Sequence, residues 1–418
     1  MKPGDVIPLT IEKPAAGGRM IARVDGQVVL VGGAIPGERV RARIERVGKG
    51  VAYAEITAIE EPSTDRRVAA GDPLCGGCLY AHMAYPRQLV IKQQVIEDAF
   101  GRIARMPLPA PVVVMASPEE GYRMRARLHV RGQQLGFFRE GTHEICDARQ
   151  TRQLLPATCD ALDLLMAALR SLRIDTVRDI ELAENLDASD RAVHLDGVAP
   201  IDVAALGRLA AADGFTGLSD KAGGRGRVHV TDTLTIGEHA PISLRRHVLA
   251  FFQGNRFLLN GLVAHVIDQI PPGAEVIDFY AGVGLFSVAA AVIRGARVTA
   301  VEGDRVSAAD LSANASSIDG ELTAVHQSVE VFAARMTRAP DRTLIVDPPR
   351  TGMSREALDG VMRAGGRLVY VSCDIATLAR DARRLVDGGF TLARVDAFDM
   401  FPNTPHVETV AVFENVRT

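Results

Sequence analysis

The sequence predicts an α/β protein: a doubly wound parallel sheet forms its C-terminal part, after a small N-terminal β-barrel and a central α+β domain. From residue 275 onward, strand-like and helix-like stretches alternate at close intervals, which is the pattern of a parallel sheet with helices on both faces. The first 60 residues alternate apolar and polar side chains between turns, as the short strands of a barrel do. Because 418 residues exceed one ordinary hydrophobic core, we expect three domains, at residues 1–62, 73–250 and 251–418.

Composition and charge place the chain among globular proteins. Hydrophobic residues make up 47% and charged residues 24% of the sequence, and the net charge is −3, so any nucleic-acid surface has to be local. No apolar run reaches transmembrane length, and the N-terminal residues do not resemble a signal peptide. We therefore expect a cytoplasmic monomer without a membrane partner. Five cysteines in a chain of this length do not indicate a disulfide framework.

Hairpin and turn signals divide the N-terminal segment into strands. Asp25-Gly26 separates two alternating runs, as in a β-hairpin, and Pro36-Gly37 marks a second turn. Arg39, Arg41 and Arg43 then alternate along one strand, so their side chains share one face. That pattern is typical either of a solvated strand face or of a stripe that contacts phosphates, and the residues alone leave both open.

The central region carries a Cys-Gly-Gly-Cys turn, a helix and a second basic stripe. Cys75 and Cys78 precede residues 84–106, whose apolar spacing predicts a helix. Residues 121–140 alternate as a strand. Three arginines fall on one face of that strand: Arg123, Arg125 and Arg127. Such a cluster occurs on solvated edge strands and on nucleic-acid surfaces alike.

Residues 276–285, VIDFYAGVGL, indicate a strand, a Gly-x-Gly turn and the start of a helix. Gly282 and Gly284 lack the Cβ that would keep a nucleotide-like ligand away from the backbone. Glu302 ends the next strand, where an acid can accept hydrogen bonds from ribose hydroxyls. Ser287 stands where a dinucleotide site needs a small residue, so the glycines alone leave a nicotinamide oxidoreductase open.

Three strand termini further along the chain carry reactive side chains. Asp347 is followed by two prolines, which either fix its carboxylate against a planar substrate or simply stop the strand. Cys373 ends a strand just before a helix, whose dipole lowers a thiol pKa, so it is either a thiolate nucleophile or a small buried hydrophobe. Glu408 opens the last strand and is either a strand-edge charge or a base that removes a proton from carbon.

Six segments, in the order FFQGN, DFYAGVG, VEGD, DPPR, YVSC and PHVETV, closely resemble the RNA 5-methyluridine methyltransferases that use S-adenosylmethionine. The phrase GGRMIARVDG…VVLVGGAIPGERV near the N-terminus resembles a TRAM domain, the small RNA-binding barrel attached to RNA-modifying enzymes. The resemblance covers nearly the whole chain and implies a Rossmann-like class I methyltransferase domain at 251–418. It implies ribosomal or transfer RNA as the substrate, and both remain open. A nicotinamide enzyme would leave Cys373 and the Pro-Pro motif unexplained.

The resemblance also implies a role for each site residue. Cys373 would add to C6 of a uracil, and Glu408 would remove the C5 proton after methyl transfer. The other positions are expected to bind S-adenosylmethionine (Gln253, Tyr280, Glu302 and Asp347) or the RNA (Asp347, Arg350, Arg123 and Arg125). RNA 5-methylcytosine enzymes carry a second cysteine in the Pro-Pro segment, and amino-group methyltransferases carry an aromatic residue after it. This chain has neither, which favours uracil.

Many relatives hold a [4Fe–4S] cluster with four cysteines, and here that pattern is incomplete. Its first and last ligand positions align with Ala69 and Thr151, which leaves Cys75 and Cys78 as remnants. Two thiolates do not make a cluster site, so we expect no bound metal and a Gly-Gly turn that persists as structure. The alternative is a site of another geometry, completed by Cys146 or Cys159 with His82 nearby.

Two rival functions are open at this point. One is an RNA-binding protein whose methyltransferase domain is catalytically altered, and the intact chemical positions argue against it. The other is a methyltransferase for another nucleic acid or for a small molecule. The barrel and the arginine strand favour a long polyanion over a small molecule.

Overall fold

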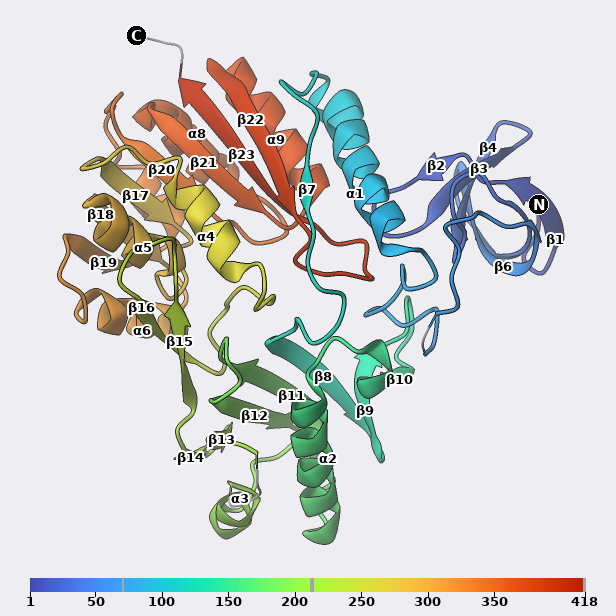
Figure 1. The fold of residues 1–418 in the computed structure, drawn as a ribbon, viewed down its shortest axis with the longest axis horizontal. Helices are drawn as coiled ribbons and strands as arrows, with labels where there is room; N and C mark the ends of the chain where they lie inside the picture. Colours follow the sequence, from blue (N-terminus) through green and yellow to red (C-terminus); the bar gives the residue numbers. More distant parts are fainter. Residues whose placement is uncertain (70, 211–213, 416–418) are drawn as a thin grey trace.

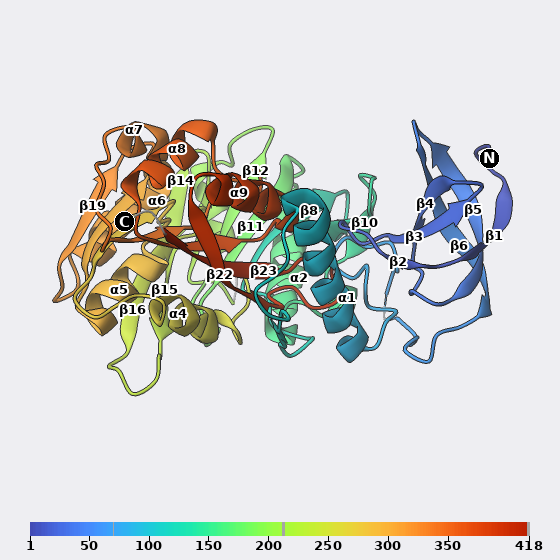
Figure 2. The same ribbon diagram turned by 90° about the horizontal axis from the view of Figure 1, so that it is seen from above.

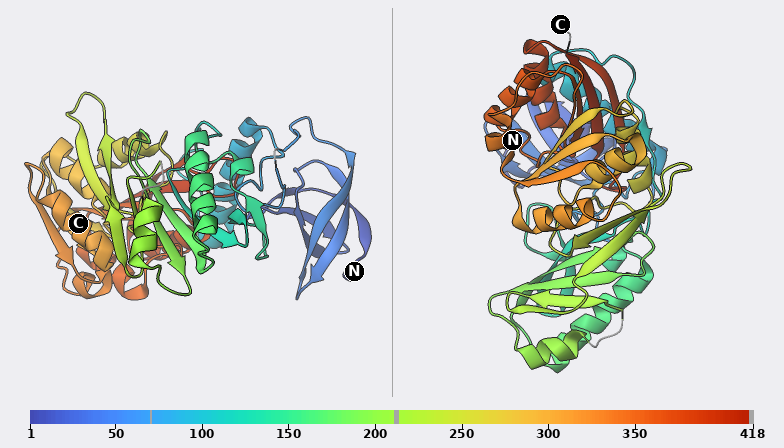
Figure 3. Two further views of the ribbon diagram at one scale, coloured as in Figure 1. Left: turned by 90° about the horizontal axis from the view of Figure 1, so that it is seen from below. Right: turned by 90° about the vertical axis from the view of Figure 1, so that its left-hand side faces the viewer.

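A computed structural model describes residues 1–69, 71–210 and 214–415, which form three sheets and a separate hairpin (Figure 1). The N-terminal barrel lies at one end of an elongated molecule, and the C-terminal sheet with its helices lies at the other end (Figure 2). The central sheet lies beside the C-terminal domain, below it in the right-hand view of Figure 3. Within the described ranges, no helix is long and apolar enough to cross a membrane.

The N-terminal barrel is a six-stranded sheet in the order β1-β5-β6-β4-β3-β2. Along β5, Val40, Ala42 and Ile44 point into the core, so the arginines between them share the exposed outer face, as the sequence predicted. The strands are β1 Val6–Thr10, β2 Lys13–Pro14, β3 Met20–Val24, β4 Gln27–Gly32, β5 Arg39–Val47 and β6 Val51–Glu61.

The central region is a seven-stranded sheet in the order β10-β9-β8-β11-β12-β13-β14, with α2 along one face (Figure 3). Ala126, Leu128 and Val130 of β8 point into that core, which leaves the basic side chains of β8 on the opposite face. Residues 219–227, SDKAGGRGR, contain the end of β13 and the whole of β14. The elements are β8 Arg125–Arg131, β9 Gln134–Phe138, β10 Ile145–Asp147, the 3-10 turn Arg149–Thr151, α2 Pro156–Ser171, β11 Val177–Glu184, β12 Arg191–Gly197, α3 Val203–Ala210, β13 Gly217–Asp220 and β14 Gly223–Gly226.

The C-terminal sheet has eight strands in the order β19-β18-β17-β20-β21-β23-β22-β7, with separate hydrophobic cores on its two faces. This confirms the doubly wound α/β class. Helices α7, α8 and α9 pack on one face, and α4 and α5 pack on the other. The elements are α4 Leu259–Ile267, β17 Glu275–Phe279, α5 Leu285–Arg294, β18 Arg297–Glu302, α6 Arg305–Ala315, β19 Leu322–His326, α7 Val329–Ala333, β20 Thr343–Val346, α8 Arg355–Ala364, β21 Arg367–Ser372, α9 Ile375–Asp387, β22 Phe390–Phe398 and β23 Glu408–Asn415.

Three segments from within residues 73–250 pack on the C-terminal domain. Helix α1, Tyr85–Ala99, continues into a π-helical turn, Phe100–Ala104, and its apolar side joins the core of α8 and α9. Strand β7, Val114–Met115, extends the sheet by pairing with β22. The hairpin of β15, His229–Leu234, and β16, Ile242–His247, covers α5 and α6. The domain boundaries at 62, 73 and 250 remain a prediction. The C-terminal end of α1, although it lies within residues 73–250, is buried in a core of the C-terminal domain.

Candidate functional site

The predicted site residues meet because neighbouring strands end at one edge of the C-terminal sheet. Tyr280, Glu302, Asp347 and Cys373 follow or end β17, β18, β20 and β21, which are adjacent in the order β18-β17-β20-β21. Strand β23 runs antiparallel to β21, so its first residue, Glu408, lies at the same edge. The sequence order alone could not show this, because β23 inserts between β21 and β22.

The Gly-x-Gly turn lies open to a ligand beside an oriented carboxylate. Both glycines have positive φ, +57° at Gly282 and +95° at Gly284. A Cβ at Gly282 would meet nothing nearer than the Phe251 carbonyl oxygen at 4.0 Å, so the space above the turn is free. The Glu302 carboxylate accepts hydrogen bonds from the backbone N–H of Gly282 and of Asp304, each at 2.7 Å. Each oxygen keeps lone pairs for a ligand hydroxyl, so these residues fit the ribose end of a nucleoside.

Strained and buried groups surround that turn. Tyr280 adopts a left-handed conformation, with φ of 58°, which is uncommon outside glycine and concentrates at functional sites. Asp278 is buried and accepts a hydrogen bond from the Ser287 hydroxyl. Burial raises the pKa of Asp278 to about 7. Ser287 of α5 is therefore engaged by the Asp278 carboxyl group of β17.

Asp347 lies between the cofactor side and the nucleophile side of the site. Its Oδ2 accepts a hydrogen bond from the Gln253 side-chain amide at 3.3 Å. Burial raises the pKa of Asp347 to about 7, and the hydrogen bond from Gln253 opposes that rise. The structure thus brings Gln253, 94 residues earlier in the chain, to the strand end that carries the carboxylate.

The environment of Cys373 differs from the expected one. We expected the dipole of the following helix to lower the thiol pKa, but burial and then the charges of Glu408 and Asp347 raise it to about 12. A hydrogen bond and the positive charge of Arg350 act in the opposite direction. The N-terminus of α9 is capped by the Asp374 side chain, which accepts a hydrogen bond from the Thr377 N–H at 2.9 Å. The N-terminus of α9 is therefore occupied by the Asp374 carboxylate. Arg350, and not the helix dipole, is the group that favours the thiolate form of Cys373.

Glu408 is buried at this sheet edge, and one of its carboxyl oxygens lacks a hydrogen-bond partner within the described part of the chain. Its side chain is 2% exposed, and its Oε1 has no hydrogen-bond partner among the described residues. Burial and the nearby charge of Asp347 raise the pKa of Glu408 well above its usual range, and Arg350 opposes that rise. A buried carboxyl oxygen without a partner, close to a cysteine, is available for a proton transfer.

The three arginines of the central strand, Arg123, Arg125 and Arg127, have different surroundings. Arg123 lies just before β8, where it bridges to Asn255, and its guanidinium lies over the rings of Phe137 and Phe401 at 5.2 and 5.6 Å. Arg125 lies 5.6 Å from the Phe251 ring centre. Arg127 is paired with Asp179 at 2.6 Å. The two predicted substrate arginines thus lie at the junction with the C-terminal domain, while the third is neutralised locally.

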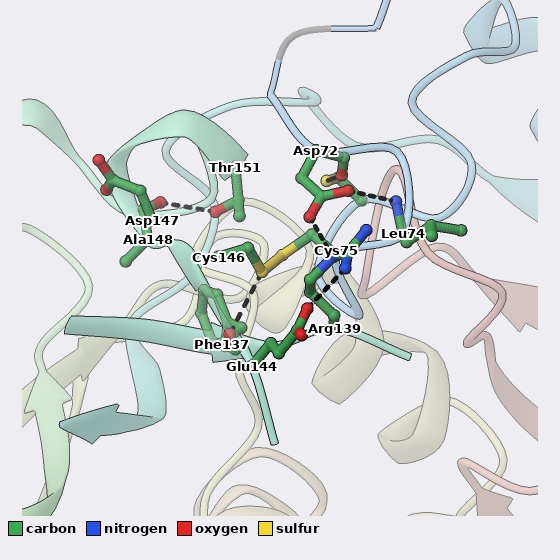
Figure 4. The surroundings of a disulfide bond; sticks show 12 residues. Asp72, Leu74, Cys75, Phe137, Arg139, Glu144, Cys146, Asp147, Ala148 and Thr151 are labelled. Carbon is green, nitrogen blue, oxygen red and sulfur yellow. Dashed lines mark hydrogen bonds and ion pairs between the residues drawn. A yellow bond between two sulfur atoms is a disulfide. The ribbon is translucent and has the colours of Figure 1, made fainter. Parts of the chain in front are cut away.

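Cys75 forms a disulfide with Cys146, contrary to what the cysteine count suggested (Figure 4). Folding brings the Cys-Gly-Gly-Cys turn beside β10, so two cysteines 71 residues apart in sequence become neighbours. Cys78 stays a free thiol, and burial raises its pKa to about 12. Among the described residues, no group of three or more His, Cys, Asp or Glu side chains is arranged to hold a metal. With both sulfurs in a disulfide, Cys75 and Cys146 offer no thiolate ligand.

The disulfide is expected to stabilise the central region. Replacing Cys146 by serine opens a 71-residue loop in the oxidised protein, and this should lower the free energy of unfolding by about 2–4 kcal/mol. Urea unfolding without reductant measures the change, with Cys159→Ala as a control that leaves the disulfide intact. Reductant should bring the wild type to the level of the variant. Equal stability of Cys146→Ser and wild type would contradict the prediction.

Sequence reasoning missed the residues that hold the segment before Glu408. Asn403 has a positive φ of 64° and hydrogen-bonds to Gln88 of α1, and Lys92 of the same helix pairs with Asp399. Residues 402–405, Pro-Asn-Thr-Pro, form a cluster that indicates a loop, but a local signal does not indicate its contact with α1. A lysine in the middle of a helix gives no such signal.

Comparisons with known proteins agree with this architecture. The family model described as tRNA (Uracil-5-)-methyltransferase matches residues 226–416, and the TRAM domain model matches residues 1–57. A 23S rRNA (uracil(1939)-C(5))-methyltransferase RlmD of Pseudomonas fluorescens is 33% identical, over 97% of this chain and 93% of its own. One of Stenotrophomonas maltophilia is 32% identical, over 95% and 94%. The crystal structure of Pyrococcus abyssi tRNA (uracil-54, C5)-methyltransferase with S-adenosyl-L-homocysteine shares the fold: its TM-score is 0.76 at 23% identity, covering 97% of this chain and 99% of that one.

Proposed function

The chain belongs to the RNA uracil-C5 methyltransferase family, which uses S-adenosylmethionine, and from this premise we propose that its substrate is a uridine of large-subunit ribosomal RNA. The relatives that match nearly the whole chain at 32–33% identity are named for uracil 1939 of 23S rRNA, which supports this choice over transfer RNA. One observation carries the assignment of the site: at one sheet edge, the charges of Glu408 and Asp347 lie close enough to raise the pKa of Cys373, and the charge of Asp347 raises the pKa of Glu408.

The residues around the Gly-x-Gly turn suit S-adenosylmethionine. Glu302 would accept hydrogen bonds from the ribose hydroxyls, because both of its oxygens are already oriented by backbone N–H groups. The open space over Gly282 would admit the nucleoside against the backbone. Tyr280, Gln253 and Asp347 would line the path from there to the uracil. When bound, S-adenosylmethionine supplies an electrophilic methyl group to C5.

The proposed mechanism assigns one step to each reactive residue. The Cys373 thiolate, favoured by Arg350, adds to C6 of the uracil, and the electron pair of the C5–C6 double bond moves toward C5 and O4. Once C5 carries the methyl group, Glu408 takes the C5 proton. The electron pair of that C–H bond restores the double bond, and the thiolate leaves C6. Asp347 would hold the uracil edge, and Arg123 and Arg125 would contact the RNA strand.

Glu302 is expected to contribute to cofactor affinity. Glu302→Gln replaces one charged acceptor by an amide, so the dissociation constant for S-adenosylmethionine should rise roughly 10- to 100-fold. Isothermal titration calorimetry measures it, with the exposed Glu321→Gln as a matched control. Unchanged affinity in Glu302→Gln would remove Glu302 from the cofactor site.

The substrate proposal is tested with unmodified transcripts. The protein is incubated with labelled S-adenosylmethionine and either a 23S rRNA transcript or a mixture of transfer RNA transcripts, and the methylated nucleoside and its position are identified by mass spectrometry of nuclease fragments. We expect 5-methyluridine in the 23S transcript. Methylation confined to transfer RNA would overturn the choice of RNA and leave the chemistry intact.

The cellular state of the protein is also a proposal. We propose a monomer, and ribosomal RNA as substrate supports a cytoplasmic enzyme. We place the domain boundaries at 1–62, 73–250 and 251–418, with α1 and β7 docked on the last unit. Light scattering of the purified protein measures its mass in solution.

A further inference from the structure

The loop between β22 and β23, residues 399–407, leads directly into Glu408. The pairing of Phe398 with Glu408 is the last rung of the β22–β23 ladder, so the loop begins and ends beside the proposed base. Since Glu408 Oε1 has no hydrogen-bond partner among the described residues, this carboxyl group is aimed mainly by its backbone. Whatever fixes the loop therefore also fixes the direction of the proton acceptor.

Gln88 of α1 hydrogen-bonds to the middle of this loop through both the oxygen and the nitrogen of its side-chain amide. Its Oε1 accepts a hydrogen bond from the Asn403 N–H, and its Nε2 donates to Asn403 Oδ1, both at 2.9 Å. The same Nε2 lies 3.1 and 3.0 Å from the carbonyl oxygens of Tyr80 and Met83. Gln88 is fully buried. This arrangement holds Asn403 in its left-handed conformation, in which a non-glycine residue needs support.

Lys92, one turn further along α1, holds the start of the loop. Its ammonium group is 1% exposed and donates to the carboxylate of Asp399 and, at 3.1 Å, to the Phe401 carbonyl oxygen. Burial lowers the pKa of Lys92, and the charge of Asp399 opposes that shift. A buried ion pair of this kind contributes little net stability compared with apolar side chains of similar volume, so its presence here suggests a role in fixing geometry.

Helix α1 packs on two bodies: Ile91 lies in the core of the barrel, and the C-terminal end of the helix lies in a core of the C-terminal domain. It stands between the barrel and β22 in Figure 1, and Ile96 and Ala99 at its C-terminal end are buried with the side chains of α9. The helix therefore connects a fixed surface of the C-terminal domain to the loop that precedes Glu408.

We propose that Gln88 and Lys92 are positioning residues for the reaction: they hold the 399–407 loop so that Glu408 faces C5 of the uracil adduct. The inference rests on the proposed role of Glu408 as the base. If it holds, loosening the loop slows removal of the C5 proton but leaves the addition of Cys373 to C6 in place. The covalent protein–RNA adduct should then accumulate.

The test uses the full-length protein and a 23S rRNA transcript containing [5-³H]uridine. Tritium release reports loss of the C5 hydrogen, and a denaturing gel reports the covalent adduct. Gln88→Met should lower tritium release about 10- to 100-fold, the scale expected for a small misplacement of a catalytic group. The adduct should rise above the wild-type level. Gln93→Met is the matched control, because the Gln93 amide donates a hydrogen bond to Glu97 of the same helix and, within residues 1–69, 71–210 and 214–415, to no loop residue.

A second variant keeps the test decisive if a single substitution prevents the protein from folding. Lys92→Met leaves Asp399 buried without its cation, so Lys92→Met/Asp399→Asn, which removes both charges, is expected to fold and to show the same adduct accumulation. Normal tritium release in both variants, or a proportional fall in adduct and release, would overturn the inference. Glu408→Gln separates failure of the proposed base from failure of the positioning role: normal tritium release in Glu408→Gln would mean that Glu408 is not the base, and the positioning role of Gln88 and Lys92 would then be wrong too.

Discussion

Replacing Cys373 by alanine is expected to abolish RNA methylation, with a loss of rate on the order of 10⁴-fold. Without the thiolate, C6 receives no nucleophile and C5 gains no electron density for the methyl transfer. Binding of S-adenosylmethionine should persist, because the cofactor turn lies on β17 and β18, two and three strands away from β21. Single-turnover transfer of a labelled methyl group measures the effect.

A second cysteine variant controls for indirect effects of removing a thiol. Cys159→Ala changes a buried free thiol in the core of the central region and should keep wild-type turnover. Turnover of Cys373→Ala within tenfold of the wild type would remove the covalent mechanism.

The pKa of Cys373 gives this residue a distinct pH dependence in the free enzyme. An unperturbed thiol ionises near pH 8.5, whereas this one has a pKa raised to about 12, so little thiolate exists at neutral pH and its fraction grows as pH rises. Alkylation of Cys373 by iodoacetamide, followed by peptide mass spectrometry, should therefore be slow at pH 7 and still accelerate above pH 9. A plateau of the alkylation rate below pH 8 would contradict the structure.

Replacing Glu408 by glutamine is expected to lower turnover about 10²- to 10⁴-fold while a covalent protein–RNA complex accumulates. The amide has nearly the same shape but cannot accept the C5 proton, so the reaction stops after the methyl group has been transferred. The same change removes one of the charges that raise the pKa of Cys373, so alkylation of the thiol in the free enzyme should become faster.

Three measurements on Glu408→Gln test these expectations together. A denaturing gel reports the complex, mass spectrometry reports the methyl group on the trapped uracil, and the alkylation rate reports the thiol. Cys373→Ala/Glu408→Gln is the matched control and should form no complex. Turnover near the wild-type rate in Glu408→Gln would assign the base to another group.

Local sequence signals were sufficient for the strands that carry chemistry and insufficient for two others. The strands ending at Asp347 and Cys373 are short, continuous apolar runs, because both faces of a central parallel strand are buried. The sequence pattern gave no clear strand signal for β19 or β22. Strand β19 lies at the edge of the sheet and is only partly buried, and β22 has an irregular register with β23 between Leu392 and Arg394, so neither shows a clean period.

For the cysteines and for α1 too, local features could be predicted from the sequence and contacts between distant segments could not. Spacing could identify Cys75 and Cys78 as a turn, but the partner of Cys75 depends on where β10 lies, and local sequence does not fix contacts between distant segments. The assignment of α1 to the C-terminal core likewise depends on which surfaces meet after folding.

The α/β class, the barrel, and the placing of Glu302, Asp347, Cys373 and Glu408 at the ends or starts of strands could be predicted from the sequence, because strand periodicity and Gly-x-Gly or Pro-Pro signals are local. That β23 enters antiparallel beside β21, and so brings Glu408 to Cys373, is visible in the folded chain alone. The tertiary structure also decided the direction of the thiol pKa, since burial and neighbouring carboxylates outweigh the helix end. These properties depend on distances between segments far apart in the chain, and such distances are set by packing.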